Sequence, residues 1–228
     1  MWRGPRSGVE VLQKGLEFAA GRGLQAHVVY HRLCELFCAF DLGEHDAVLD
    51  GVPALERALE SYGWASALVW LRSFGVGVAT LRGKPVDAAT LGWIEEGARE
   101  SSEPDDLLGL AATVPAHLLR GERDAARTLL IELGPHMAAP YAWWWQAWEI
   151  ASLVRASLEL DELGLAESMV GGFHTRNPYA QHAAVTAKAS ILEARGDLAA
   201  AITAYGDAAD RWASFEVVRI IVGCDGRG

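Results

Sequence analysis

The sequence contains few cysteines and no long apolar run, and each absence excludes a class of protein. Only three cysteines occur among 228 residues, so disulfides cannot form the framework of the fold. Cys34 and Cys38 lie four residues apart, about one helical turn, which favours a reducing, cytoplasmic setting. No run of about 18 apolar residues occurs, and polar residues interrupt the N-terminal segment, so we expect neither a membrane span nor a signal peptide.

Basic residues are also scarce. Lys and Arg total 20 against 30 Asp and Glu, and the formal net charge is −10. An acidic chain without a basic cluster is poorly suited to phosphate backbones or anionic lipids, so we expect no direct binding to nucleic acid or membrane. Hydrophobic residues make up 51% and charged residues 22%, a balance typical of a folded globular protein.

Motifs for catalysis and for cofactor binding are missing as well. The sequence has no G-x-x-x-x-G-K-[ST] phosphate loop, no G-x-S-x-G nucleophile elbow and no H-E-x-x-H zinc motif. Adjacent carboxylates such as Glu95 and Glu96 occur near predicted helix ends, where we expect them to be solvated. We therefore predict no catalytic residue, no cofactor and no metal, and expect that the chain is not an enzyme.

A repeating helical pattern is what the chain does contain. Helical segments end at Gly or Pro, and strand-like alternation is almost absent. A glycine-containing turn motif recurs at intervals of roughly 30 to 45 residues, in FDLGEHDAV, TLRGKPVDA, LLRGERDAA, DELGLAES and EARGDLAAA. We expect its glycines to take the left-handed conformation that ends a helix: Gly43, Gly83, Gly121, Gly164 and Gly196.

This repeat predicts an all-α fold, a right-handed α-solenoid of about five helix pairs in a single domain over residues 1–228. The first helices of the pairs are predicted at 24–42, 64–82, 105–120, 141–163 and 178–195, and the second helices at 45–61, 86–101, 122–133, 165–173 and 197–213. Residues 8–21 read as half a repeat and residues 215–228 as an irregular tail. Both ends favour a fragment, or a descendant, of a larger array.

The last unit, AKASILEARGDLAAAITAYGDAADRW, resembles a tetratricopeptide repeat, with matches at Gly196, Ala201, Tyr205 and Ala208. The third unit, AHLLRGERDAARTLL, is similar at fewer positions. More narrowly, GLEFAAGRGL, LFCAFDLGEHD and the last unit resemble the C-terminal helical arrays of large actinobacterial-type regulators. These are signal-transduction ATPases that carry an adenylate-cyclase-like domain or a LuxR-type DNA-binding domain. The sequence departs from that pattern after Trp212.

This resemblance implies a non-catalytic interaction module, the scaffold or sensor part of a bacterial signalling or transcriptional regulator. Its partner would be a protein or peptide, or another domain of a parent regulator. The open ends of a solenoid also carry apolar surface that a second copy can cover, so a homodimer through these ends is a further expectation.

An unusual cluster of aromatic residues supplies the candidate partner-binding residues. The segment PYAWWWQAWE contains Tyr141, Trp144, Trp145 and Trp148, and Trp70 lies on another first helix. Two interpretations are open. The indoles either fill the joints between repeats or line a groove, where tryptophan is enriched among residues that dominate binding.

The segment HVVYHRLCELFC places His27, His31, Cys34 and Cys38 along one side of a helix, and these residue types are the preferred zinc ligands. A rise of about 1.5 Å per residue separates His27 from Cys38 by roughly 16 Å, so the four cannot share one ion. The favoured interpretation is packing at a repeat joint. The alternative function, a small-molecule-binding or metal-dependent helical-repeat protein, would need a further ligand from another helix.

Overall fold

The computed structural model describes residues 4–137, 144–173 and 177–217, and helices account for most of them. No described residue lies in a strand, which confirms the all-α class. The helices are α1 (Pro5–Ala20), α2 (Gln25–Asp41), α3 (His45–Tyr62), α4 (Ala65–Leu81), α5 (Ala88–Glu100), α6 (Leu107–Leu119), α7 (Arg123–Met137), α8 (Trp144–Glu159), α9 (Leu163–Gly172), α10 (Pro178–Ala194) and α11 (Leu198–Phe215). A short 3-10 helix, η1 (Pro104–Asp106), leads into α6.

Each predicted helix has a counterpart, and most boundaries agree within a few residues. The predicted half-repeat at 8–21 is α1, which packs against α2. Two helix ends differ by four residues: the helix predicted at 122–133 extends to Met137 as α7, and the one predicted at 141–163 ends at Glu159 as α8. Residues 141–143, and residues 218–228 of the predicted tail, lie outside the described residues.

The turns between paired helices explain the early end of α8. Gly43, Gly83, Gly121 and Gly196 have positive φ angles of 64° to 80°, as predicted. The prediction for Gly164 is wrong, because this residue lies inside α9. Asp161 takes the left-handed conformation instead, with φ of 64°. Aspartate tolerates this region better than most residues, so a turn needs no glycine there.

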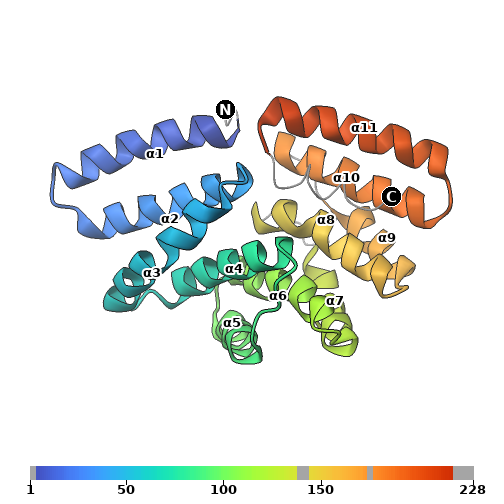
Figure 1. Cartoon of the computed structure of the whole chain (residues 1–228), viewed down its shortest axis with the longest axis horizontal. Helices are drawn as coiled ribbons and strands as arrows, with labels where there is room; N and C mark the ends of the chain where they lie inside the picture. Colours follow the sequence, from blue (N-terminus) through green and yellow to red (C-terminus); the bar gives the residue numbers. More distant parts are fainter. Residues whose placement is uncertain (1–3, 138–143, 174–176, 218–228) are drawn as a thin grey trace.

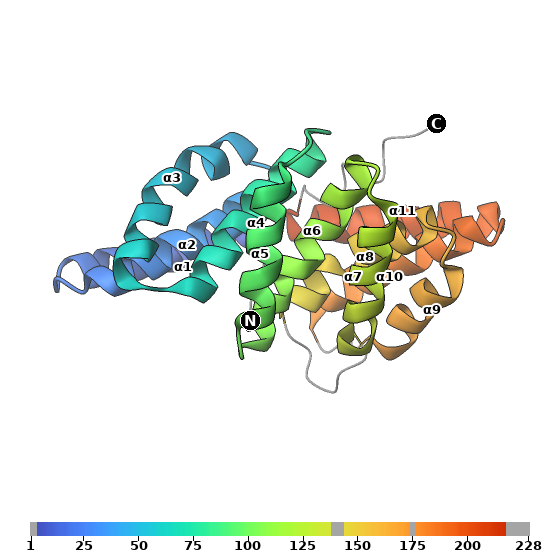
Figure 2. The ribbon, with the colours of Figure 1, turned by 90° about the horizontal axis from the view of Figure 1, so that it is seen from below.

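The helices form two rows, as in a helical repeat. Helices α4, α6, α8 and α10 lie side by side as an inner row, and α3, α5, α7, α9 and α11 each pack against the inner helix next to them in the chain. Figure 1 shows the rows following a curve, with α1 and α2 at one end and α10 and α11 at the other. Figure 2 views the molecule from the side that α5 and α7 cover.

A continuous apolar core fills the space between the rows. Small residues allow the helices to approach one another. A Cβ atom at Gly109 of α6 would lie 2.8 Å from a methyl of Val69 in α4 and 3.0 Å from one of Ile94 in α5. None of the described helices combines the length and low polarity that crossing a bilayer requires.

The two ends of the described chain meet. A Cβ atom at Gly4 would lie 2.5 Å from the carbonyl oxygen of Phe215, and Arg6 Nε lies 3.6 Å from Glu216 Oε1. Figure 1 shows the start of α1 beside the end of α11. The open solenoid ends expected from the sequence therefore contact each other along this edge. The outer faces of α1 and α11 still expose apolar side chains, such as Val11 and Ile202.

Candidate functional site

A cavity of about 410 Å³ lies on the inner row, along α6 and the C-terminal parts of α4 and α8. We call it the inner cavity. Its lining includes Phe40 of α2, Phe74 and Thr80 of α4, Leu118 of α6, Glu149 of α8 and Thr186 of α10. Since it draws on five helices that are distant in sequence, it exists only in the folded array.

Three aromatic rings form the apolar base of the inner cavity. The ring centroids of Phe40 and Phe74 are 5.9 Å apart, and each lies 5.4 Å from that of Trp148. All three side chains are buried. Rings at these separations and tilts gain favourable edge-to-face contacts, so the base is a rigid packed surface.

Polar side chains of α8 also line the inner cavity. Glu149, Ser152, Arg155 and Glu159 follow one another at helical spacing and all line the cavity. Glu149 is only 7% exposed, which is unusual for a carboxylate. The Thr80 hydroxyl, on α4, is shielded from solvent and has no hydrogen-bond partner among the described residues. The inner cavity therefore offers an apolar base together with hydroxyl, carboxylate and guanidinium groups.

Asp41, the last residue of α2, holds Phe40 against the inner row. Asp41 is 4% exposed, and its Oδ1 accepts hydrogen bonds from Trp148 Nε1 at 2.8 Å and from the Tyr179 hydroxyl at 3.2 Å. Gly77 leaves the space for the Phe40 ring, because a Cβ there would lie 2.9 Å from Phe40 Cζ. Helices α8, α10 and α4 thus fix the end of α2 together.

The tryptophans predicted to bind a partner do not form one exposed surface. Trp145 is 0% exposed, and Trp148 is buried at the base of the inner cavity. Both positions agree with the interpretation that the indoles fill joints between repeats. Trp144 is 36% exposed, and its ring lies 5.8 Å from that of Trp70, which is partly buried. Tyr141 lies outside the described residues. Trp145 therefore has no surface with which to touch a partner in this structure.

The segment HVVYHRLCELFC packs at a helix joint. A Cβ at Gly15 of α1 would lie 2.8 Å from the His31 imidazole, so this flank of α2 faces α1. Burial, with the nearby charge of Asp41, raises the pKa of Cys38 to about 12, and burial also raises the pKa of Cys34. Both cysteines are free thiols. No group of three His, Cys, Asp or Glu side chains that could hold a metal ion is found within the described ranges.

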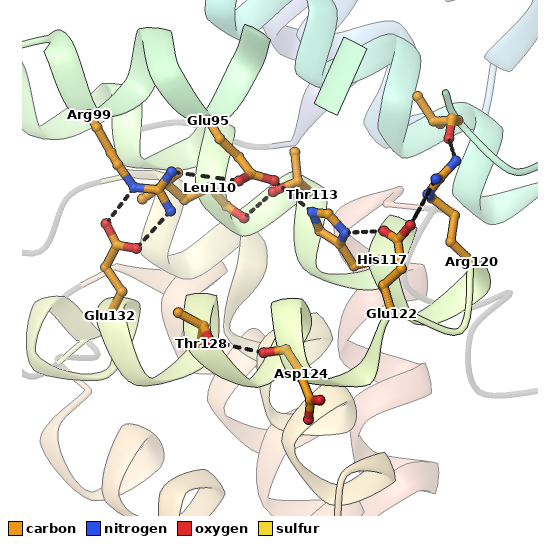
Figure 3. Close-up of polar contacts among 11 residues, drawn as sticks. Glu95, Arg99, Leu110, Thr113, His117, Arg120, Glu122, Asp124, Thr128 and Glu132 are labelled. Atoms are coloured by element: carbon orange, nitrogen blue, oxygen red, sulfur yellow. Dashed lines mark hydrogen bonds and ion pairs between the residues drawn. The ribbon is translucent and has the colours of Figure 1, made fainter. Parts of the chain in front are cut away.

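A second polar cluster, which sequence reasoning missed, joins α5, α6 and α7 (Figure 3). His117 Nε2 lies 2.6 Å from Glu95 Oε1, and His117 Nδ1 lies 2.7 Å from Glu122 Oε2. Two carboxylates at the two ring nitrogens favour the imidazolium, in which both nitrogens donate. The hydrogen bond to Glu95 raises the pKa of His117, with a further contribution from Glu122. We call this cluster the histidine clamp.

Arginines extend the histidine clamp on both sides. Hydrogen bonds from Arg120 and His117 lower the pKa of Glu122 to about 2. Arg99 donates two hydrogen bonds to Glu132 of α7, at 3.0 and 2.9 Å, and lies 3.6 Å from Glu95. Burial opposes ionisation of Glu95, but the hydrogen bond and charge of His117 lower its pKa overall. The prediction that Glu95 is simply solvated is therefore wrong, whereas Glu96 is exposed.

The geometry of the histidine clamp favours a structural role. Each ring nitrogen of His117 is held by a carboxylate, so neither is available to take a proton from a substrate. The signal in the sequence was weak, since Glu95 and His117 are 22 residues apart on different helices. Only the packing of α5 on α6 brings them together.

Comparisons with known proteins add no further constraint. A scan against models of protein families finds no match, and searches of curated proteins and of solved structures find no similar chain. The resemblance to tetratricopeptide repeats and to the helical arrays of regulators thus stays a prediction from the sequence.

Proposed function

We propose that the chain is a non-catalytic binding module, a right-handed, tetratricopeptide-like α-solenoid that serves as the scaffold or sensor part of a bacterial signalling or transcriptional regulator. Its inner cavity would receive an apolar side chain of a protein or peptide partner, including a segment of a parent regulator. The inner cavity itself is the observation that supports this proposal most strongly. A cytoplasmic setting belongs to the proposal, because Cys34 and Cys38 are free thiols.

The size and chemistry of the inner cavity suit binding. A volume of about 410 Å³ lies within the range of roughly 300 to 1,000 Å³ that is usual for ligand pockets. Its apolar base of Phe40, Phe74 and Trp148 would take an aliphatic or aromatic group. The polar groups of α8 would then orient the main chain or a charged end of the partner. Trp144, at 36% exposure, is the one proposed anchor on α8 that a partner could reach outside the cavity.

A cavity-filling substitution tests this proposal. Ser152 lines the inner cavity, so Ser152→Trp would occupy it, whereas Ser168 is an exposed serine on α9 that supplies the matched Ser168→Trp control. A random peptide library displayed on phage would be selected on the wild-type chain. We expect the enriched peptides to bind wild type and S168W, and to lose at least about tenfold in affinity for S152W. Equal binding to both variants would remove the cavity as the site.

A small-molecule sensor is the second candidate, and one observation favours it. Thr80 lines the inner cavity, and its hydroxyl is shielded from solvent without a partner among the described residues, so a compact ligand whose polar group reached it would satisfy it. A thermal-shift screen of small apolar alcohols and amides tests this idea. Compounds that stabilise the wild type but not Thr80→Val would support it, and equal stabilisation of both would contradict it.

A further inference from the structure

The contacts of Asp41 reach across the array instead of along it. In a stacked helical repeat each unit contacts mainly its neighbours. Trp148 and Tyr179, which donate to Asp41, lie 107 and 138 residues further along the chain. These bonds connect α2 directly to α8 and α10 and bypass the helices between them. These hydrogen bonds therefore hold an early helix of the array against two late ones. Figure 1 shows the end of α2 beside the starts of α8 and α10.

Other contacts continue this closure on either side of Asp41. The Phe37 ring lies 5.0 Å from the Trp144 ring and 5.2 Å from the Trp148 ring. The start of α1 meets the end of α11 through Gly4 and Phe215 and through the Arg6–Glu216 pair. We call the contacts of Gly4, Arg6, Phe37, Phe40 and Asp41 with Trp144, Trp148, Tyr179, Phe215 and Glu216 the closure seam.

The closure seam completes the inner cavity. Phe40 is the residue through which α2 lines the cavity, and it precedes Asp41 directly. If α2 left α8, the cavity would lose this wall, and Phe74 and Trp148 would become accessible. The state of the seam thus decides whether the inner cavity, which is partly open to solvent, keeps its α2 wall.

A carboxylate makes this closure reversible in a way that an apolar joint is not. In the closed array Asp41 is buried and accepts the hydrogen bonds of Trp148 and Tyr179, and a carboxylate accepts such bonds more strongly than a neutral group does. In an open array the same carboxylate would regain its hydration, which offsets much of the loss. A leucine at this position would gain nothing from water. The Asp41 carboxylate therefore has hydrogen-bond partners in both states of the seam: side chains of α8 and α10 when the seam is closed, and water when it is open.

We infer that Asp41 is the positioning residue of a clasp that closes the two ends of the array on each other and so gives the inner cavity its α2 wall. As a mode of regulation this rests on the proposed function, since it controls access to the proposed binding cavity. The closure itself does not depend on any ligand.

Cross-linking between the ends measures closure directly. Glu216 lies beside Arg6, so Arg6→Lys places an amine where a carbodiimide can couple it to the Glu216 carboxylate without a spacer. Mass spectrometry of the digested chain then gives the yield of this link. We expect the link to form in the R6K chain, and Asp41→Ala to reduce its rate of formation at least about tenfold, since two donors lose a charged acceptor. Asp50→Ala, which removes an exposed aspartate of α3, is the matched control and should leave the rate unchanged.

Two companion measurements separate opening from unfolding. Circular dichroism should give the same helix content for R6K with and without Asp41→Ala, and small-angle scattering should give a larger maximum dimension for the variant. Asp41→Asn keeps an acceptor oxygen but not the charge. Its cross-linking rate and its maximum dimension should lie between those of the R6K chain and those of the Asp41→Ala variant. An unchanged link, or a loss of helix in Asp41→Ala, would overturn the clasp. If the clasp behaves as inferred but no peptide binds, the proposed function fails and the clasp stands.

Discussion

The closure seam and the histidine clamp both depend on carboxylates, but they solve different problems. In the histidine clamp, Glu95 and Glu122 face an imidazolium and arginines, and the bonded partners of the cluster lie 2 to 33 residues apart. In the closure seam, Asp41 is buried and accepts hydrogen bonds from Trp148 and Tyr179, which lie more than 100 residues away. The clamp fixes neighbouring helices to one another, whereas the seam fixes the curvature of the whole array. Changes at the two places should therefore differ in magnitude and in their dependence on pH.

The largest effect is expected from Trp148→Ala. This substitution removes the indole donor to Asp41 and the ring that contacts Phe37, Phe40 and Phe74, and it should lower the free energy of unfolding by about 3 to 5 kcal/mol. Trp144→Ala, at the partly exposed end of the same helix, should cost less than half as much. Urea denaturation of both variants measures the difference. Equal losses would show that the burial of Trp148 and its bond to Asp41 add no stability beyond what the partly exposed Trp144 of the same seam contributes.

A glycine pair sharpens the same point. Ala at Gly77 would place its Cβ 2.9 Å from the Phe40 ring, and we expect a loss of about 1 to 3 kcal/mol. Gly75 lies on the same helix with nothing within 4 Å, so Gly75→Ala should stabilise the chain by up to about 1 kcal/mol through helix propensity. Thermal unfolding of the two variants should shift in opposite directions. A shift in the same direction would contradict the packing of α2 on α4.

The histidine clamp should give a pH-dependent contribution. Because the pKa of His117 is raised, its contribution is complete below the ordinary histidine value of 6.5 and is lost as pH rises through the raised value. The pKa of Glu95 is lowered, so its contribution is present above the ordinary value of 4.5 and is lost as pH falls through the lowered value. Both contributions are therefore complete between the two ordinary values, 4.5 and 6.5, and the histidine clamp stabilises the fold most in this pH range.

His117→Phe tests this window. We expect a loss of about 1 to 2 kcal/mol near pH 6, because the buried hydrogen bonds to carboxylates disappear, and a smaller loss near pH 9. Urea unfolding at both pH values measures it, with the exposed His27→Phe as the control. A loss of the same size at both pH values would mean that His117 is not held as an imidazolium.

The smallest effect is expected at the outer edge of the histidine clamp. Arg99 and Glu132 form a bidentate pair, but both side chains are partly exposed. Arg99→Gln should cost only about 0.5 kcal/mol, and the difference should shrink further in 0.5 to 1 M salt, roughly where such pairs are screened. A loss comparable to that of His117→Phe would show that Arg99 contributes as much stability to the packing of these helices as His117 does.

Local features of the fold could be predicted well from the sequence. Helix boundaries depend on apolar spacing and on turn residues such as Gly43 and Gly121, and both signals lie within a few positions of the feature that they determine. The failure at Gly164 has the same origin, since Asp161 can also adopt a left-handed backbone. The α8 tryptophans were correctly identified as unusual, but the sequence left open which of them the packing would bury.

The inner cavity and its clasp could not be predicted in this way. Nothing near Asp41 in the sequence indicates that Trp148 and Tyr179 will donate to it, because that meeting depends on the summed curvature of all the intervening helices. Small changes in each helix crossing accumulate along the array. The same limitation applies on a shorter scale to Glu95 and His117, which only the packing of two helices brings together.

Nuclear Overhauser effects at Phe40 in the isotope-labelled chain would decide whether the array is closed around the inner cavity. If α2 is docked, the Phe40 ring protons should show effects to the Gly77 α-protons and to the Trp148 indole, since these groups are in contact in the closed array. Effects from Phe40 to Gly77 but none to Trp148, or none to either, would contradict the closed cavity and the clasp together.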